Sequence, residues 1–277
     1  MPELPPLRES LEAHGLMAKK SFGQHFLLDL NVTRKIVRLG QEANPFDGQV
    51  VIEVGPGPGG LTRAALESDA AFVLAIEKDS RFIELLSELD AAYPDRFGVV
   101  EADALKVDEP ALLAERGLPP EAHLVSNLPY NVGTPLLIKW LTGPWQPKSL
   151  TLMFQLEVAL RVVAPVGDDD YGRLGVISQV LCDCEKLMDL PARAFTPPPK
   201  VDSAVVRLIP RAERPTPKII RNLEMITAAA FGQRRKMLRA SLKGLGGETL
   251  LAKVGIDPTL RAENISPADF LRLAEAL

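Results

Sequence analysis

Apolar segments alternate with helical segments along the first part of the chain, and this alternation restricts the fold more than any other feature. The apolar segments are nearly free of polar residues, which is the pattern of strands buried on both faces of a sheet. Such strands, separated by helices, predict an α/β fold with a mostly parallel sheet covered on both sides. The expected strands are residues 50–54, 71–76, 99–100, 124–126 and 150–154, and helices are expected from about residue 60 and over 81–91, 136–141 and 158–163.

The pattern changes after residue 210. Residues 202–209 are predicted to form a strand that pairs with 187–190 in an antiparallel edge hairpin, whereas 174–181 are helical or buried. From there on only helices are expected, over 219–231, 235–243, 249–254 and a last helix with Ser266 as N-cap, Pro267 in the first turn and Asp269 as its capping partner. We therefore predict a domain over residues 1–210 and a small all-helical domain over 211–277.

Local signals also suggest where other helices begin. Asn31 is expected to cap a helix that ends near Gly40, and Thr134 to cap the helix at 136–141 with Pro135 in its first turn. Residues 1–20 contain several prolines and predict a flexible or loosely packed arm.

Charge is unevenly distributed. The net charge of the chain is −4, but residues 186–243 hold 13 Lys or Arg and 4 Asp or Glu, so this stretch carries +9 and the remainder −13. A basic surface beside an acidic one is expected of a protein that holds a polyanion on one part only, although a solvated basic face is the alternative. No apolar stretch approaches the roughly 20 residues that span a bilayer, and the start of the chain lacks a secretory pattern.

The two cysteines, Cys182 and Cys184, have no second Cys or His pair to complete a metal site. We expect reduced structural thiols, no metal, no membrane association, and a cytoplasmic protein.

A glycine-rich loop follows the first strand. Residues 55, 57 and 60 form G-x-G-x-x-G, and Glu77 lies 20 residues after Gly57, a spacing that fits either a dinucleotide or S-adenosylmethionine (SAM). Two prolines in the loop remove N–H donors that would hold a pyrophosphate. Glu53 and Asp103 add carboxylates, which favour the cationic SAM over phosphates. SAM is therefore the predicted cofactor, with Glu77 accepting ribose hydroxyls and Asp103 the adenine amine.

The tetrapeptide Asn127-Leu128-Pro129-Tyr130 follows an apolar strand. The amide oxygen of an Asn and a nearby carbonyl can accept both hydrogens of an exocyclic amine, while an aromatic ring stacks on the base. This arrangement suits methyl transfer to a nucleobase nitrogen. Taken alone, the tetrapeptide also fits an ordinary strand-to-turn transition.

Seven segments of the chain together resemble the ribosomal RNA adenine N6,N6-dimethyltransferases of the KsgA type. They are KKSFGQHFL (19–27), VIEVGPGPGGLT (51–62), AIEKD (75–79), EADAL (101–105), NLPYN (127–131), AFTPPPKVDSAVVRL (194–208) and RAENIS (261–266). The resemblance implies a Rossmann-like SAM-dependent methyltransferase sheet. It also implies dimethylation of two adjacent adenosines in the hairpin loop near the 3′ end of 16S rRNA, within the small (30S) ribosomal subunit.

The resemblance also assigns residues. Its SAM contacts fall on His25, Leu27, Gly55, Gly57, Glu77, Asp103 and Asn127. The family usually has Asn where this chain has His25, and a protonated imidazole beside a sulfonium would be unfavourable, so we expect a neutral His25. The family often has Gln-Lys-Glu where this chain has Leu156 between Gln155 and Glu157, so one basic RNA contact is missing.

The predicted catalytic residues are Asn127, Leu128, Pro129, Tyr130 and Phe195, with the amide oxygen of Asn127 and the carbonyl of Leu128 accepting the N6 hydrogens. Tyr130 would stack on one face of the adenine and Phe195 on its other face or edge. Arg261 and Glu263 are expected to form a structural pair before the last helix. The predicted phosphate contacts are Lys200, Arg207, Arg234, Arg235, Lys236 and Arg239.

Three other functions compete with this interpretation. A 23S rRNA adenine N6-methyltransferase of the antibiotic-resistance type shares the NLPY core, but the RAENIS segment and the long basic C-terminus favour the small-subunit enzyme. The protein could instead act mainly as a small-subunit assembly factor. An NAD oxidoreductase would need a catalytic acid for hydride transfer, and none is evident. We expect a monomer.

Overall fold

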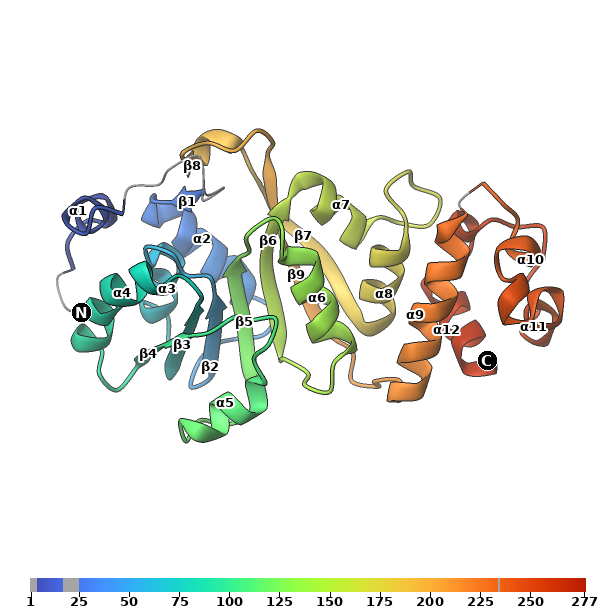
Figure 1. The fold of residues 1–277 in the computed structure, drawn as a ribbon, viewed down its shortest axis with the longest axis horizontal. Coiled ribbons are helices and arrows are strands. Elements are labelled where there is room, and N and C mark those ends of the chain that lie inside the picture. Colours follow the sequence, from blue (N-terminus) through green and yellow to red (C-terminus); the bar gives the residue numbers. More distant parts are fainter. Residues whose placement is uncertain (1–3, 17–24, 234) are drawn as a thin grey trace.

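A seven-stranded sheet forms the centre of the protein (Figure 1), whose computed structural model describes residues 4–16, 25–233 and 235–277. The strand order is β4-β3-β2-β5-β6-β9-β7. The first five strands are parallel, and β9 runs antiparallel to both β6 and β7, which confirms the predicted parallel sheet with an antiparallel edge hairpin. The strands are β2 Val50–Val54, β3 Phe72–Glu77, β4 Phe97–Glu101, β5 Ala122–Asn127, β6 Ser149–Gln155, β7 Cys182–Leu190 and β9 Ser203–Pro210.

Helices cover both faces of the sheet because alternate strand residues point to opposite sides and nearly all of them are apolar. One face packs against α2 (Leu30–Gln41), α3 (Gly60–Leu66) and α4 (Ser80–Ala92) through side chains such as Val51 and Val125. The other face, which includes Ile52 and Leu124, packs against α5 (Glu109–Glu115), α6 (Gly133–Thr142), α7 (Leu156–Val163) and α8 (Arg173–Leu181).

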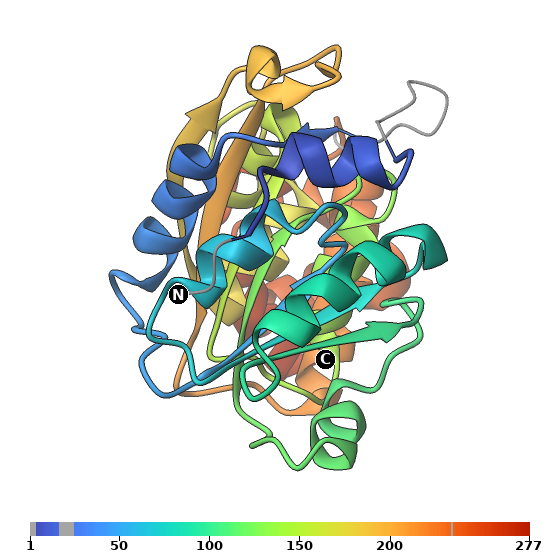
Figure 2. The same ribbon diagram turned by 90° about the vertical axis from the view of Figure 1, so that its left-hand side faces the viewer.

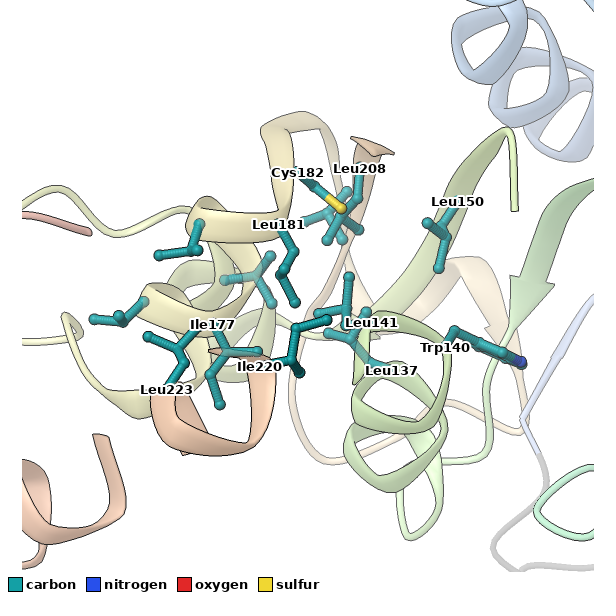
Figure 3. Packing of buried hydrophobic residues seen from close by; sticks show 14 of the residues in the cluster. Leu137, Trp140, Leu141, Leu150, Ile177, Leu181, Cys182, Leu208, Ile220 and Leu223 are labelled. Atoms are coloured by element: carbon teal, nitrogen blue, oxygen red, sulfur yellow. The ribbon is translucent and has the colours of Figure 1, made fainter. Parts of the chain in front are cut away.

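The C-terminal helices are α9 (Pro217–Gly232), α10 (Leu238–Ser241), α11 (Gly247–Lys253) and α12 (Pro267–Ala276), at the end of the molecule opposite α1 in Figure 1. One apolar cluster runs from the sheet into these helices without interruption. Figure 3 shows Ile220 and Leu223 of α9 beside Ile177 of α8 and the α6 side chains Leu137 and Leu141. The domain boundary at residue 210 stays a prediction, because the hydrophobic core is continuous across it.

Several helix termini differ from those predicted. Asp29, one position before the helix, caps α2 by accepting from the backbone N–H of Asn31 at 2.9 Å. The helix α6 begins at Gly133, before Thr134, and the segment predicted over 235–243 is helical only over Leu238–Ser241. The last helix is as predicted, because Ser266 and Asp269 form a reciprocal capping box. The expected Arg261–Glu263 pair is present at 3.9 Å.

The N-terminal arm is in part a packed helix, contrary to the prediction. α1 (Leu7–Ala13) buries two leucines, Leu7 at 3% and Leu11 at 1% exposure. The guanidinium of Arg63 in α3 holds it by donating to the carbonyl of Pro5 at 2.5 Å. Figures 1 and 2 show α1 beside α3 and α4. Pro5 and Pro6 precede the helix instead of disrupting it, and residues 1–3 and 17–20 of the arm lie outside the described residues.

A buried ion pair ties the loop after β4 to α6. The carboxylate of Glu109 is 4% exposed and accepts from Lys139 Nζ and Trp140 Nε1, each at 2.7 Å. Lys139 also donates to the carbonyls of Ala104 at 2.8 Å and Val107 at 2.5 Å. The loop that follows Asp103 is therefore fixed to the helix that follows the NLPY segment.

Both cysteines are free thiols, and burial raises the pKa of Cys182 to about 12. Within the described part of the chain, no group of His, Cys, Asp or Glu side chains is placed to hold a metal ion. No helix among the described residues has the length and apolar character needed to cross a membrane.

Candidate active site

A cavity of about 470 Å³ opens at the carboxyl ends of β2, β3 and β5. In an open parallel sheet this is the edge where ligands bind. The cavity brings together residues that are far apart in the sequence, and most of the predicted cofactor and catalytic residues are among them. Its lining is His25, Phe26, Leu27, Glu53, Gly55, Pro56, Gly57, Pro58, Gly60, Leu61, Glu77, Phe82, Asn127, Leu128, Pro129, Tyr130 and Asn131.

The glycine loop needs its glycines for two reasons. Gly55, Gly57 and Gly59 have φ values of 68°, 52° and 83°, in the left-handed region that side chains disfavour. At Gly60 a Cβ would lie 2.6 Å from the carbonyl oxygen of Leu27, so only glycine lets the segment before α2 pass over the start of α3. The loop can therefore bend around the cavity while residues 26–27 close one side of it.

Glu77 ends β3 and anchors this loop. Its Oε2 accepts from the backbone N–H of Gly57 at 3.1 Å, and its Oε1 accepts from the N–H groups of Lys78 and Asp79 at 2.8 Å. Burial raises the pKa of the carboxyl, and these three N–H donors oppose that rise. Glu77 thus holds the loop as well as facing the cavity, and its contact with ribose hydroxyls stays a prediction.

Glu53 is the most deeply buried carboxyl of the cavity, at 1% exposure. It accepts from the hydroxyl of Thr62 at 2.5 Å. Burial raises the pKa of Glu53 to about 8, so in the free protein it carries a proton at neutral pH. From its sequence Glu53 was expected to carry a fixed negative charge, and its burial corrects that expectation. Thr62 was not among the expected site residues, although it ends the quoted segment 51–62.

Asp103 does not line the cavity. Its Oδ2 forms an ion pair with Lys78 Nζ at 2.9 Å, and its Oδ1 accepts from the N–H of Leu105 at 3.1 Å. The bond to Lys78 is the main reason that the pKa of Asp103 lies below its usual value. Its predicted contact with the adenine of the cofactor stays a prediction.

Asn127 ends β5 with its side chain at the cavity. Its Nδ2 donates to the carbonyl of His25 at 3.3 Å. A carbonyl can only accept, so this bond turns the amide nitrogen to His25 and leaves Oδ1 available on the other side. Pro129 lies against Gly55: a Cβ added to Gly55 would be 3.6 Å from the Cδ of Pro129. The side chain of Leu128 is buried at 1% exposure, so this segment is held by the core.

The ring of Tyr130 is half-buried and held at its hydroxyl. The hydroxyl shares a hydrogen bond with Ser203 Oγ at 2.8 Å, and burial raises the pKa of the phenol. The imidazole of His25 stacks near it, with ring centroids 5.9 Å apart and an angle of 30° between planes. His25 in turn donates from Nδ1 to the carbonyl of Pro197 at 2.7 Å. Ser203 was not among the residues expected at the site, although it lies within the quoted AFTPPPKVDSAVVRL segment.

Phe195 is the one predicted catalytic residue that does not line the cavity. It lies in β8 (Phe195–Thr196), which pairs antiparallel with β1 (Phe26–Leu27), and its side chain is 3% exposed within the apolar cluster that contains α2 and α4. It is absent from the lining of the cavity. The long-range pairing of β1 with β8 thus places the ring in the core of the protein without a bound base, and its contact with the target adenine stays a prediction.

The predicted phosphate contacts divide into three groups. Lys200, Arg235, Lys236 and Arg239 are exposed, and Arg239 lies 3.5 Å from a carboxylate oxygen of Glu248. Arg234 lies outside the described residues. Arg207 is different, because its guanidinium donates to the carbonyl of Leu39 at 2.9 Å and to Glu185 at 2.6 Å, and its side chain is only 11% exposed. These contacts hold Arg207 in the sheet, and its contact with a phosphate stays a prediction.

One cavity in this sheet combines the proline-bearing glycine loop, the buried carboxyl groups and the NLPY segment. Together these features define a Rossmann-like SAM-dependent methyltransferase. The cavity suits the cationic cofactor, since its described lining holds the carboxyl groups of Glu53 and Glu77 and no Lys or Arg, where a dinucleotide would need phosphate ligands. The model of the family "Ribosomal RNA adenine dimethylase" matches residues 15–277. The chain belongs to this family of rRNA methyltransferases.

Relatives in other organisms agree with this assignment. Ribosomal RNA small subunit methyltransferase A of Phenylobacterium zucineum is 66% identical over 273 residues, with 99% of this chain and 93% of the relative covered. The protein of the same name in Caulobacter vibrioides is 63% identical, with coverages of 94% and 97%.

Two solved structures share most of the fold. A dimethyladenosine transferase from Plasmodium falciparum is 26% identical, with a TM-score of 0.73 over 90% of this chain and 96% of that one. The 23S rRNA methyltransferase ErmE is 29% identical, with a TM-score of 0.68 and coverages of 91% and 99%.

Proposed function

We propose that this protein dimethylates the N6 amines of two adjacent adenosines in the 3′-terminal hairpin loop of 16S rRNA, acting as a cytoplasmic monomer on the small ribosomal subunit. The observation that carries the chemistry is the amide of Asn127, whose oxygen is left available at the cavity by the bond from Nδ2 to His25. The small-subunit substrate is supported by relatives up to 66% identical that are named for that subunit, against 29% identity to the 23S enzyme.

The chemical problem is the weak nucleophilicity of adenine N6, whose lone pair is delocalised into the ring. In the proposed mechanism Asn127 Oδ1 and the carbonyl of Leu128 accept the two N6 hydrogens and draw the amine towards tetrahedral geometry. Bound SAM supplies an electrophilic methyl group. The two oxygens stabilise the positive charge that develops on N6, and its proton then passes to water. Pro129 restricts the backbone directly after the carbonyl of Leu128 and so helps to hold it in place. Positioning of this kind provides much of the remaining acceleration.

Removal of the Tyr130 ring tests the stacking part of this mechanism. Base–aromatic stacking is worth about 1–3 kcal/mol per base, so Tyr130→Ala should lower kcat/KM for small subunits roughly tenfold to a hundredfold. The affinity for SAM, measured by calorimetry, should change much less. An equal loss of both would contradict a role in holding the base.

The binding of SAM should depend on pH through Glu53. Its pKa of about 8 means that the free cavity holds a proton below that pH, and a cationic ligand favours the ionised form. Binding then releases this proton, so affinity should rise by up to about tenfold per pH unit towards pH 8 and level off above it. Glu53→Gln should flatten this profile. Calorimetry from pH 6 to 9 measures it, and a flat profile for the unmodified protein would refute the linkage.

The same proton affects folding with the opposite sign. The ordinary pKa of a Glu carboxyl is 4.5 and the folded-state pKa of Glu53 is about 8, so between these pH values the folded state binds more protons than the unfolded state. Its contribution to stability is therefore present at low pH and is lost as the pH rises through this interval.

Mass spectrometry of 16S rRNA tests the proposed substrate. Small subunits that lack the modification are incubated with the protein and labelled SAM, and two dimethylated adenosines in the 3′-terminal hairpin are expected. Label in 23S rRNA alone would indicate the other substrate. If assembly were the main role, a catalytically inactive Asn127 variant would restore subunit maturation in cells that lack the protein as well as the active protein does.

A further inference from the structure

Ser203 is a fixed point beside the cavity. It is the first residue of β9, it is fully buried, and its backbone is paired with Gln155 of β6 on one side and Leu190 of β7 on the other. A serine in the interior of a sheet contributes little apolar area, so its value lies in its hydroxyl. That hydroxyl bonds to Tyr130 at 2.8 Å.

Tyr130 needs such a fixed point. It follows β5 in the segment that leads to α6, and its ring is half-buried with a hydroxyl that requires a partner. One face of the ring is turned to His25 at a centroid distance of 5.9 Å. For a base to lie between two rings, their planes must be about 7 Å apart, which is twice the best carbon–carbon separation, so no base fits between Tyr130 and His25. The other face of Tyr130 is therefore the one that receives a base, and its tilt sets the position of that base relative to Asn127.

We infer that Ser203 is a positioning residue for the target adenine, which acts by holding the hydroxyl of Tyr130 and thereby the tilt of its ring. The inference rests on the proposed function, because it assigns the base to the face of Tyr130. It makes the antiparallel hairpin of β7 and β9, whose residues are absent from the cavity lining, part of the machinery that orients the substrate.

A cycle of two substitutions tests this role. Ser203→Ala and Tyr130→Phe remove the same hydrogen bond from its two ends, and Tyr130→Phe keeps the ring and leaves β9 untouched. Each should lower kcat/KM for small subunits roughly tenfold, the size expected for one such bond. The double variant should be no worse than either single variant. SAM affinity should stay within twofold of that of the unmodified protein in all three.

Ser178→Ala is the matched control. Its hydroxyl is also fully buried, but it has no hydrogen-bond partner among the described residues and lies in α8, outside the cavity lining. Its kinetics should be unchanged.

Two results would overturn the inference: unchanged kinetics in Tyr130→Phe, or effects of the two single variants that add in the double variant. Tyr130→Phe decides the matter even if Ser203→Ala does not fold. A failure of the unmodified protein to produce N6-methylated adenosine in small subunits would instead count against the proposed function.

Discussion

Asn127→Ala should lower the rate of methyl transfer roughly 10²–10³-fold, the loss seen when one polar group that stabilises a transition state is removed. The alanine side chain cannot accept an N6 hydrogen, so the amine stays closer to planar. The positive charge that forms on N6 during methylation is then stabilised by one dipole instead of two. The rate is measured from labelled methyl groups in 16S rRNA under single-turnover conditions, which exclude product release. The affinity for SAM should fall only modestly, because the rest of the cavity lining is unchanged.

The control for this variant is Asn31→Ala, which removes an exposed amide outside the cavity lining and should leave the rate unchanged. Thermal unfolding of both variants should match that of the unmodified protein within a few degrees. A near-normal rate for Asn127→Ala would rule out the proposed mechanism, whatever the identity of the substrate.

Glu109→Ala should destabilise the fold by about 3–5 kcal/mol, because it removes the only carboxylate among the described residues that pairs with the largely buried ammonium of Lys139, which keeps just its two carbonyl acceptors. The indole N–H of Trp140 loses its acceptor in the same step. Glu109→Gln keeps one oxygen for these donors and should cost less. Chemical denaturation, followed by circular dichroism, gives the free energy of unfolding.

Glu115→Ala is the comparison on the same helix, since that carboxylate is exposed and its loss should change stability by no more than about 0.5 kcal/mol. Equal stabilities for Glu109→Ala and Glu115→Ala would show that the buried pair contributes nothing. At temperatures well below its unfolding transition, Glu109→Ala should still methylate RNA, because neither Glu109 nor Lys139 lines the cavity.

The sheet could be predicted because its information is local. Strands such as 50–54 are apolar at every position, so periodicity alone identifies them, and the last helix carries its own capping box in Ser266 and Asp269. The start of α2 was less certain, because Asp29 and Asn31 can both cap a helix and only the backbone geometry distinguishes them.

The site was predictable where the motifs are contiguous and less so where side chains meet across the fold. The lining residues between Gly55 and Tyr130 come from separate loops at the carboxyl ends of the parallel strands. The topology of the sheet is enough to bring these loops together. The position of Phe195 depends on the pairing of β1 with β8, and that of Arg207 on the register of β9 with β7, which sets Glu185 opposite it. Neither pairing can be obtained from local sequence.

The uninterrupted apolar cluster between the sheet and the C-terminal helices has a mechanical consequence. A close-packed interior has few ways to deform, so α9 and α12 cannot swing on a hinge relative to the strands without opening voids. The exposed cations around residues 235–239 are therefore carried at a constant offset from the cavity. In the proposed function, such a rigid protein selects its substrate by spacing: an RNA can place a base at the cavity and phosphates on these cations together only when the two already lie that far apart.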